Sequence, residues 1–237
     1  MLKIVNLSKS YKGAKKAVDN ISLEVKGGEI VGFIGHNGAG KTTTIKSIVG
    51  ILDFTEGEIY IDGLSIKKDP IKCKEKIAYI PDNPDLYESL TGIQYLNFIA
   101  DIFKVSKEER ESLIGKYGDA FEITKSFGDL ISSYSHGMKQ KLAIISALIH
   151  KPKLLILDEP FVGLDPKASH TLKEIMKSLC KEGGAIFFST HVLEVAEKIC
   201  DKIAIINDGK LVAEGETAKV IGDGSLEDIF MEMINNG

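Results

Sequence analysis

The feature that most constrains this chain is a glycine-rich stretch, Glu29–Thr44, which follows an apolar run and precedes a helix-like segment. It matches the pattern G-x-x-x-x-G-K-[ST], with Gly35, Gly40, Lys41 and Thr42 at the fixed positions. Glycine lets the backbone bend tightly enough for several N–H groups to converge on phosphate oxygens. The helix that follows points the positive end of its dipole at the same anion. The stretch therefore predicts a phosphate-binding loop.

The side chains of this loop complete the expected site. Lys41 supplies a full positive charge near the β- and γ-phosphates, so we count it as catalytic as well as binding, and the Thr42 hydroxyl suits Mg²⁺. Further binding contacts are expected from Asn37, Gly38 and Thr43. The alternative is a glycine-rich turn without a ligand. At the usual glycine frequency, however, a chance match in a chain of this length is about a one-in-a-hundred event. We therefore predict a nucleotide site.

Composition narrows the class of protein. The chain has 237 residues, of which 43% are hydrophobic and 27% charged, a balance that suits one large domain or a domain with a subdomain. A net charge of -4 and a single arginine, Arg110, argue against a nucleic-acid binder, which usually carries a basic patch. Three scattered cysteines without a C-x-x-C pair fit a reducing compartment and disfavour a disulfide framework or a zinc site. Since no leader and no long apolar run is found, we expect a soluble protein of the cytosolic type.

Apolar periodicity predicts an α/β chain whose sheet core is interrupted by helices. Strands are predicted over residues 2–7, 18–25, 30–34, 57–63, 77–80, 154–157, 185–189, 202–206 and 211–213. Helices are predicted after Thr42, Thr91 and Ser106, from about Gly137, and over residues 165–181, 192–199 and 225–234. Strand signals stop at the breaker cluster 81–84 and return at 154. We therefore expect a single domain, 1–237, with a nucleotide-binding core (1–82 and 151–237) and a helical insertion (83–150).

Two acids follow the most apolar of these strands. Asp158 and Glu159 come directly after Leu154–Leu157, a run typical of a strand buried on both faces. Ligands of an open α/β sheet bind at the carboxyl edge of its strands. We therefore expect Asp158 to hold Mg²⁺ through water and Glu159 to orient or deprotonate an attacking water. A pair of solvated turn acids is the alternative. This alternative is disfavoured beside a phosphate loop, because a bound nucleotide requires a metal ion and the acids can bind that ion.

Together these stretches resemble an ATP-binding-cassette (ABC) ATPase over nearly the whole chain. Five motifs fit in the family's order: Gly35–Thr43 (Walker A), Tyr134–Lys141 (signature), Leu154–Glu159 (Walker B), Gly163–Pro166 (D-loop) and Thr190–His191 (switch histidine). The resemblance implies an α/β P-loop NTPase core with a parallel sheet, an antiparallel β subdomain and a helical insertion subdomain. It also implies an ATPase that uses ATP and Mg²⁺.

The resemblance assigns roles to residues outside the phosphate loop. Tyr11 stands where the family has an aromatic that stacks on adenine, although on its own it could equally be a core aromatic. His191 follows the strand 185–189 at the same sheet edge as Asp158 and becomes a catalytic candidate. Ser135 and Gly137 would contact the γ-phosphate of ATP held by a second copy, or by a second ABC subunit, so that ATP is sandwiched between two subunits.

Some of this follows from the residues themselves. Ser135 precedes an amphipathic helix, so its hydroxyl and the first free N–H groups form an anion site. Phosphoryl transfer requires charge neutralisation, often by an arginine. Arg110 lies far from every motif in the sequence, so an arginine finger within the chain is not expected.

The sequence departs from the usual family pattern at three positions. His136 replaces a signature glycine, Met138 replaces a glutamine, and Asp82 stands where the family most often has glutamine. An acid can still bind Mg²⁺ or water, so Asp82 is kept as a metal-ligand candidate, whereas His36 and His136 are expected only to shape their loops. These forms, with the Ser225–Phe230 tail, resemble exporter-type cassettes of bacteria that serve multidrug, lantibiotic or ion efflux. The importer pattern fits less well.

The leading hypothesis is the ATPase subunit of a transporter whose membrane-spanning permease is a separate polypeptide. Such a subunit is cytoplasmic and peripheral on the inner face of the cell membrane. One alternative is a soluble cassette ATPase acting on DNA or ribosomes, but tandem cassettes, coiled-coil insertions and zinc modules are not seen, and no nucleic-acid partner is expected. A small-molecule kinase would usually need more arginines, and Glu159 disfavours a nucleotide switch without catalysis.

The permease is expected to dock on the helical insertion. Leu86 and Tyr87 lie between the breaker Pro84 and the capping residue Thr91, in an expected surface loop. Exposed apolar side chains beside the nucleotide-sensing Asp82 suit a groove for a partner helix. Phe98 and Phe103 are instead expected in the core of the helical subdomain.

Overall fold

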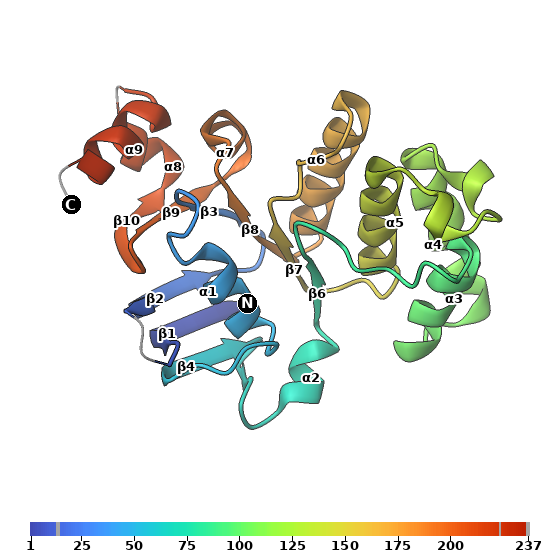
Figure 1. Ribbon diagram of the computed structural model, residues 1–237, viewed down its shortest axis with the longest axis horizontal. Coiled ribbons are helices and arrows are strands. Elements are labelled where there is room, and N and C mark those ends of the chain that lie inside the picture. Colours follow the sequence, from blue (N-terminus) through green and yellow to red (C-terminus); the bar gives the residue numbers. More distant parts are fainter. Residues whose placement is uncertain (13–14, 223, 236–237) are drawn as a thin grey trace.

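The computed structural model describes residues 1–12, 15–222 and 224–235. At its centre lies a six-stranded sheet with the order β10-β9-β3-β8-β7-β6 (Figure 1). Its strands are β3 (Ile30–Ile34), β6 (Ile77–Ile80), β7 (Leu154–Asp158), β8 (Ala185–Thr190), β9 (Lys202–Asn207) and β10 (Lys210–Glu216). The strands β6, β7, β8, β3 and β9 run parallel, and β10 pairs antiparallel with β9. The parallel core that the sequence predicts is confirmed.

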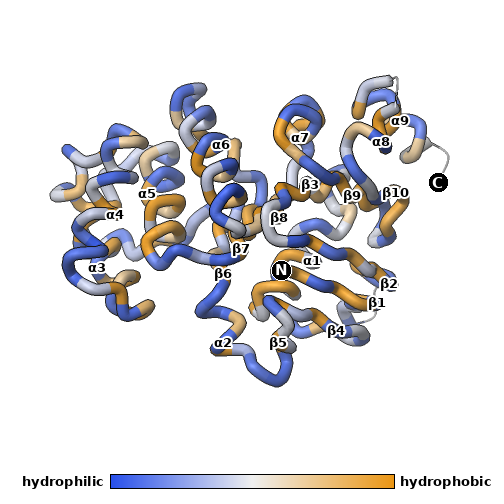
Figure 2. The backbone as a smooth tube through the Cα atoms, turned by 180° about the vertical axis from the view of Figure 1, so that it is seen from behind, coloured by the Kyte–Doolittle hydropathy of each residue, from blue (hydrophilic) through white to orange (hydrophobic). Residues whose placement is uncertain are grey.

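The central strands are buried on both faces. In β3, Ile30 and Ile34 belong to one core cluster, whereas Val31 and Phe33 belong to the cluster on the other face. A strand covered on both sides needs apolar residues at successive positions. This explains why β3 and β7 appear in the sequence as continuous apolar runs, and Figure 2 shows hydrophobic residues concentrated in the strands.

A second, antiparallel sheet has the order β2-β1-β4-β5. It consists of β1 (Leu2–Ser10), β2 (Lys16–Val25), β4 (Glu56–Ile61) and β5 (Leu64–Ser65). Helix α1 (Lys41–Ile48) packs between this sheet and the parallel one, because its Ile45 and Ile48 lie in the same core cluster as Ile59 of β4 and Phe33 of β3. The expected antiparallel β subdomain is therefore present.

Helices α6 (Pro166–Lys181) and α7 (Leu193–Ile199) cover the opposite face of the parallel sheet. Helix α6 begins as its sequence predicts. The Asp165 carboxylate accepts a 2.8 Å hydrogen bond from the Ala168 N–H, and Pro166 occupies the first turn, where a missing N–H costs nothing.

The helices between β6 and β7 gather at one end of the molecule, on the right in Figure 1. They are α3 (Gly92–Ile102), α4 (Lys107–Ala120) and α5 (His136–Leu148), with the 3₁₀ turns η1 (Thr124–Ser126) and η2 (Ile131–Ser133). Helix α3 begins after Thr91 as predicted, where Thr91 and Gln94 exchange side chain–backbone hydrogen bonds in a capping box. Ser106 caps α4 in the predicted way.

Two expectations for this region are wrong. Leu86 is only 7% exposed, because backbone hydrogen bonds from Ile131 and Ser132 to residues 90 and 88 strap segment 83–90 onto the helical region and turn Leu86 inward. Phe98 is 41% exposed, because the buried face of α3 carries Leu96 and Ala100, and residue 98 lies on the opposite side of the helix.

The chain ends in a hairpin and two helices. The turn Asp208–Gly209 joins the two predicted strands β9 and β10 into a hairpin, and both residues have positive φ, 48° and 81°, as a tight hairpin turn requires. Helices α8 (Thr217–Ile221) and α9 (Leu226–Asn235) follow. The sequence does not reveal α8, α2 (Pro70–Lys74) or β5, because elements this short carry no periodicity.

Cys73, Cys180 and Cys200 are all buried and unbridged. Burial raises the pKa of the Cys180 thiol to about 11. Cys200 packs tightly against β3, where a Cβ at Gly32 would lie 2.7 Å from its sulfur. Across the parts of the chain that the structure describes, no helix combines the length and the apolar character needed to cross a membrane.

Candidate active site

The loop between β3 and α1 is tightly confined at its two glycines. A Cβ at Gly35 would lie 2.6 Å from the carbonyl oxygen of Ile206, and one at Gly40 would lie 2.5 Å from the carbonyl oxygen of Ala17. Gly40 also has φ +110°, a conformation that side-chain-bearing residues rarely adopt. Glycine is therefore needed at both motif positions, at Gly35 for lack of space and at Gly40 for lack of space and for its backbone conformation.

His36 ties this loop to the end of β9. Its Nε2 lies 3.0 Å from Asn207 Oδ1, and its Nδ1 lies 2.7 Å from the carbonyl oxygen of Asn37. The ring therefore holds the loop in place, in agreement with the structural role expected for this histidine.

Lys41 is the buried cation of the site. Its ammonium donates to the carbonyl oxygens of Gly35 (2.7 Å) and His36 (3.2 Å) and lies 3.6 Å from Glu159 Oε1. The lysine side chain is 7% exposed, and a buried charge of this kind needs such partners. Lys41 thus joins the phosphate loop to the acid at the end of β7.

Asp158 connects the start of α1 to the neighbouring strand β8. It is 1% exposed; its Oδ2 accepts a 2.8 Å hydrogen bond from the Thr42 hydroxyl, and its Oδ1 accepts one from the Ser189 hydroxyl. Sequence reasoning missed Ser189. The available signal was a polar residue at the end of an apolar strand, and the register places Ser189 directly opposite Asp158.

Glu159 lies between two nitrogen-bearing groups. One carboxylate oxygen faces Lys41, and the other lies 2.9 Å from His191 Nδ1 and accepts the His191 backbone N–H at 3.3 Å. The Glu159 backbone has φ +49°, and its N–H donates to the Ser189 carbonyl at 3.2 Å. Two sequence-distant candidates, Glu159 and His191, are thus in direct contact.

These residues surround one cavity of about 220 Å³ at the carboxyl edge of the parallel sheet. The side chain of Asp82 also reaches it, and its Oδ1 accepts the Asn83 N–H at 2.8 Å. The cavity is lined by Ala17, His36, Asn37, Gly38, Gly40, Lys41, Thr42, Thr43, Asp82, Asp158 and Glu159. The structure therefore brings the predicted phosphate, metal and acid residues together.

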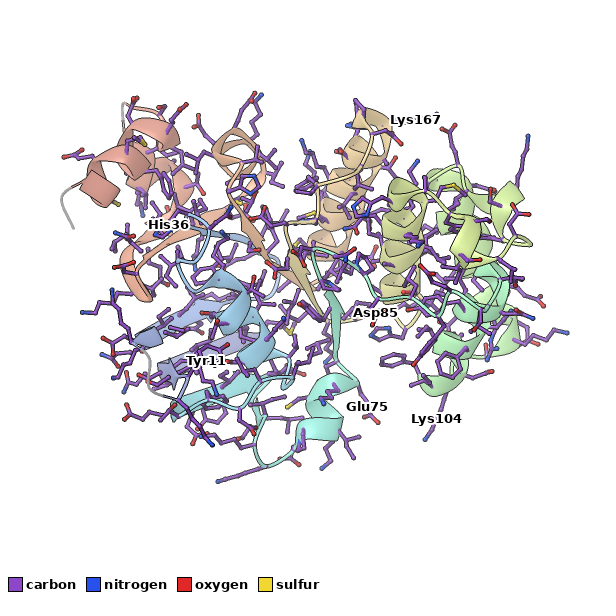
Figure 3. All side chains as sticks on the ribbon, viewed as in Figure 1. Tyr11, His36, Glu75, Asp85, Lys104 and Lys167 are labelled. Atoms are coloured by element: carbon purple, nitrogen blue, oxygen red, sulfur yellow. The ribbon has the colours of Figure 1, made fainter. Side chains whose placement is uncertain are left out.

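Five sequence candidates do not line this cavity within the described residues. Gly35 and His191 lie just behind its lining, where Gly35 accepts from Lys41 and His191 contacts Glu159. The other three are Tyr11, Ser135 and Gly137. Tyr11 is 47% exposed at its edge, with its hydroxyl 3.5 Å from Thr43 Oγ1 and the Lys9 ammonium 5.4 Å from its ring centre. Figure 3 shows Tyr11 on the side of the β sheets and Asp85 toward the helical end. Ser135 and Gly137 lie at the start of α5, where the Ser135 hydroxyl accepts the Met138 N–H at 3.3 Å.

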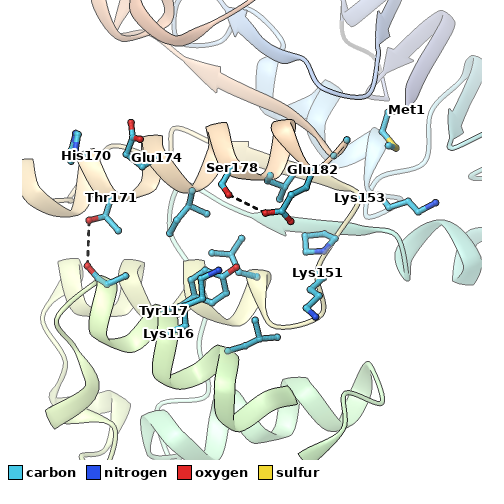
Figure 4. A pocket seen from close by; sticks show the side chains of 18 residues that line it. Met1, Lys116, Tyr117, Lys151, Lys153, His170, Thr171, Glu174, Ser178 and Glu182 are labelled. Carbon is cyan, nitrogen blue, oxygen red and sulfur yellow. Dashed lines mark hydrogen bonds between the residues drawn. The ribbon is translucent and has the colours of Figure 1, made fainter. Parts of the chain in front are cut away.

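A larger cavity of about 770 Å³ lies between α4 and α6, away from this chemistry (Figure 4). Ser178 and Glu182 are hydrogen-bonded along one wall, and Thr171 bonds to Ala120 across the gap. Among the described residues, none of the motif side chains lines it. The smaller cavity is therefore the candidate active site.

A family model described as ABC transporter matches residues 18–162, more than half of the chain. A model described as an AAA domain matches the shorter stretch 130–197. The ABC-type transporter ATP-binding protein EcsA of Bacillus subtilis is 35% identical over 98% of this chain and 96% of its own length. The bacitracin transport ATP-binding protein BcrA of Bacillus licheniformis is 39% identical over 90% of this chain and 69% of its own length.

Solved structures show the same family. One, described as an ATP binding subunit of an ABC transporter, superposes with a TM-score of 0.94 at 35% identity and covers 98% of this chain and 99% of its own. The dimeric cassette MJ0796 bound to ADP and Pi, a post-hydrolysis state, superposes with a TM-score of 0.82 at 28% identity over 92% and 99% of the two chains. This chain therefore belongs to the ABC transporter family, as an ATP-binding subunit that hydrolyses ATP.

Proposed function

We propose that this chain powers export of a substrate through a separate permease by hydrolysing ATP at the Lys41–Glu159 cavity. The observation that carries the proposal is the position of Glu159, whose two carboxylate oxygens face Lys41 and His191 beside the phosphate loop. A carboxylate oriented by an ion pair and a backbone N–H at the edge of a phosphate site is placed to accept a proton from water.

The phosphate loop and Lys41 would bind the triphosphate. The backbone N–H groups of a glycine-rich loop and a helix N-terminus attract anions, and Lys41 adds the full charge. In the structure, Lys41 instead donates to the carbonyl oxygens of its own loop. Because those bonds are to neutral oxygens, they can be exchanged for stronger bonds to phosphate. Tyr11, at the edge of the cavity, would stack on the base.

Thr42, Asp158 and Asp82 fit Mg²⁺ by the chemistry of their oxygens. Mg²⁺ prefers one or two carboxylates together with substrate phosphates and keeps several waters. The contact between the Thr42 hydroxyl and the buried Asp158 carboxylate supplies such oxygens at the phosphate loop, with Asp82 across the same cavity. Bound there with ATP, the ion would neutralise charge on the phosphates.

Hydrolysis requires a water aligned with the terminal phosphorus. As the water oxygen bonds to phosphorus and the bond to the bridging oxygen breaks, Glu159 takes the proton from the water and ADP leaves. His191 would hold the Glu159 carboxylate in place through its 2.9 Å contact. The backbone N–H of His191 to the same oxygen adds a second restraint.

A second subunit would complete the site. Ser135 and Gly137 lie at the exposed start of α5, which is a ready anion site outside the cavity of their own chain. We propose that they contact the γ-phosphate bound by a second copy, or by a second ABC subunit. The dimeric state of the relative MJ0796 supports this arrangement.

The permease would dock on the helical part of the chain. We propose that this part, 83–150, is a subdomain inserted into the nucleotide-binding core formed by 1–82 and 151–237. Tyr87 is 57% exposed, and its ring lies edge-on to Phe98, with centroids 5.6 Å apart. This exposed aromatic pair suits a partner helix. The names of BcrA and of the linearmycin resistance protein LnrL support export. The chain would then lie on the cytoplasmic face of the membrane through its permease.

The Glu159→Gln substitution tests the proposed chemistry. Loss of a general base slows turnover on the order of a hundredfold or more, while binding of a fluorescent ATP analogue is spared. Glu194→Gln, on the exposed surface of α7, is the matched control and should hydrolyse ATP normally. Turnover at the wild-type rate in Glu159→Gln would remove the proposed role of this carboxylate.

The Tyr87→Lys substitution tests the proposed docking surface. Surface changes rarely disturb a fold, so the isolated subunit should keep its ATPase rate within about twofold. Co-purification with the permease should be lost. Ile71→Lys, at a 73% exposed apolar residue on α2, controls for the added charge. Normal co-purification of Tyr87→Lys would place the docking surface elsewhere.

A further inference from the structure

The ring of His136 packs against the loop that follows Glu159. A Cβ at Gly163 would lie 2.5 Å from His136 Cδ2 and 2.7 Å from its Nε2, so the imidazole covers the Cα of Gly163. Gly163 has φ +80°, so this position needs glycine for its backbone conformation as well as for the ring beside it. His136 therefore does more than shape its own loop.

Two further contacts join the start of α5 to the same loop, residues 160–165. Gly137 approaches the carbonyl oxygen of Gly163 so closely that a Cβ would lie 3.0 Å from it. Lys141 Nζ lies 2.7 Å from Asp165 Oδ2, and the lysine side chain is only 17% exposed. Lys141, together with the Ala168 N–H, holds the pKa of Asp165 below its usual value. The first turns of α5 thus brace this loop at more than one point.

The start of the 160–165 loop constrains the backbone conformation of Glu159. The Val162 N–H donates to the Glu159 carbonyl at 3.2 Å, while the Glu159 N–H donates to Ser189 of β8. A non-glycine residue at φ +49° keeps that conformation only when its surroundings hold it. The direction of the Glu159 side chain therefore depends on where the 160–165 loop lies.

The same imidazole also faces the segment after Asp82. His136, Asp85, Glu88 and Lys139 help to line a cavity of about 500 Å³, and Lys139 forms an ion pair with Glu88 across it. A glycine at position 136 would remove the imidazole both from this cavity and from its contact with Gly163. His136 thus lies between the segment that carries Tyr87 and the 160–165 loop that follows Glu159.

We propose that His136 is a positioning residue for ATP hydrolysis, whose ring braces the 160–165 loop and so holds the Glu159 carboxylate between Lys41 and His191. The proposal rests on the proposed role of Glu159. It assigns His136 no contact with ATP. Its effect is on the rate of the chemical step, because small misplacements of a catalytic group reduce turnover far more than they reduce binding.

The first test compares His136→Gly with His136→Phe. His136→Gly should lower kcat roughly tenfold, with the affinity for a fluorescent ATP analogue unchanged within about twofold. His136→Phe keeps a flat ring over Gly163 and should recover most of kcat. Equal losses in the two variants, or a loss that lies in ATP affinity, would overturn the proposal.

A double-mutant cycle with Gly163→Ala tests the contact itself. In the wild-type background the new methyl group meets the His136 ring, so kcat should fall sharply. In the His136→Gly background the ring is absent, so the same change should lower kcat clearly less, by only what the backbone strain at residue 163 causes. The backbone strain at residue 163 is common to both backgrounds and cancels in the cycle. Fully additive effects would overturn the proposal.

Glu159→Gln in the same assay distinguishes failure of the positioning role of His136 from failure of the proposed role of Glu159. If Glu159→Gln is inactive while His136→Gly retains the wild-type kcat, the positioning role fails and the proposed function stands. If Glu159→Gln turns over normally, the proposed function of Glu159 fails first.

Discussion

The two regions that we propose to bind phosphate differ in how completely one chain builds them. At the Lys41–Glu159 cavity, the charged and polar groups bond to one another: Lys41 to its loop carbonyls, Asp158 to Thr42 and Ser189, and Glu159 to His191. At the start of α5, Ser135 is exposed, and among the described residues its hydroxyl accepts just the N–H of Met138 in its own first turn.

This difference shows which interactions the chain can complete alone. The cavity has acid, base and hydroxyl groups within hydrogen-bond distance, so it needs nucleotide and metal but no further protein group for binding. The first turn of α5 has the N–H groups that a helix start leaves without intrahelical partners, and among the described residues it lies outside the cavity, which suits a site that serves another subunit. The consequence is that changes at the cavity should affect binding in the monomer, whereas changes at α5 should affect association.

The largest expected effect is on nucleotide binding by Lys41→Ala. Removing a buried ammonium that bonds to phosphate should weaken ATP binding roughly 10- to 100-fold, the range for a lost hydrogen bond to a charged group. Titration of the monomeric protein with a fluorescent ATP analogue measures it. Lys46→Ala, on the exposed side of the same helix, should bind normally. Unchanged affinity in Lys41→Ala would mean that the loop binds phosphate without its lysine.

Ser135→Ala should separate the two regions. Binding of ATP to the monomer should be unchanged, while ATP-dependent dimerisation in the Glu159→Gln background should weaken roughly tenfold. Sedimentation with ATP and Mg²⁺ against ADP gives the dimer fraction, and Ser132→Ala is the control. An equal dimer fraction with ATP and ADP in the parent protein would contradict the two-subunit site.

Tyr11→Ala tests a side chain at the boundary of the self-contained cavity. A base stacked on an aromatic ring contributes on the order of 1 kcal/mol or more, so ATP affinity should fall about fivefold. Tyr11→Phe keeps the ring and should bind like the wild type. If both variants bind normally, the base lies elsewhere.

The smallest expected effect is on the pH dependence of stability and comes from His150, which follows α5. His150 Nε2 lies 3.0 Å from the Ile77 carbonyl oxygen, its ring stacks on Phe103, and burial lowers the pKa of His150 below its usual value. The unfolded chain therefore binds a proton at His150 more readily than the folded chain does. The contribution of neutral His150 to the free energy of unfolding is complete above the ordinary histidine pKa. It is lost as pH falls from there toward the lower pKa of His150 in the folded chain.

His150→Phe should accordingly flatten the dependence of the urea midpoint on pH across this acidic range. The exposed His170→Phe is the control and should keep the wild-type pH dependence. A wild-type pH dependence in His150→Phe would show that the buried imidazole does not contribute to it.

Local patterns were enough to predict part of the site. Gly35, Lys41 and Thr42 act within one turn and one helix start, so their spacing alone indicates what they do. The contacts of Asp158 with Ser189 and of Glu159 with His191 depend on how β7 and β8 align, which no short motif reports. The alternation of apolar runs predicted that these strand ends share an edge, but it did not predict which side chains touch.

The errors also have physical causes. Phe98 was placed in the core because it is aromatic, but the rotation of α3 is set by Leu96 and Ala100, and that rotation turns Phe98 outward. Leu86 was placed on the surface because it follows a proline, yet backbone hydrogen bonds from Ile131 and Ser132 of η2 hold its segment inward. The packing of His136 on Gly163 joins two motifs that are separate in sequence and could not be predicted from either one.

The burial of the three cysteines has a practical consequence for labelling. Thiols react as thiolates, so buried sulfurs with raised pKa values, such as Cys180 and Cys200, react slowly while the protein is folded. A new surface thiol, for example in Tyr87→Cys, can therefore carry a fluorescent probe without removal of the native ones. The native thiols in turn become reporters of unfolding, because their modification requires the core around β3, α2 or α6 to open.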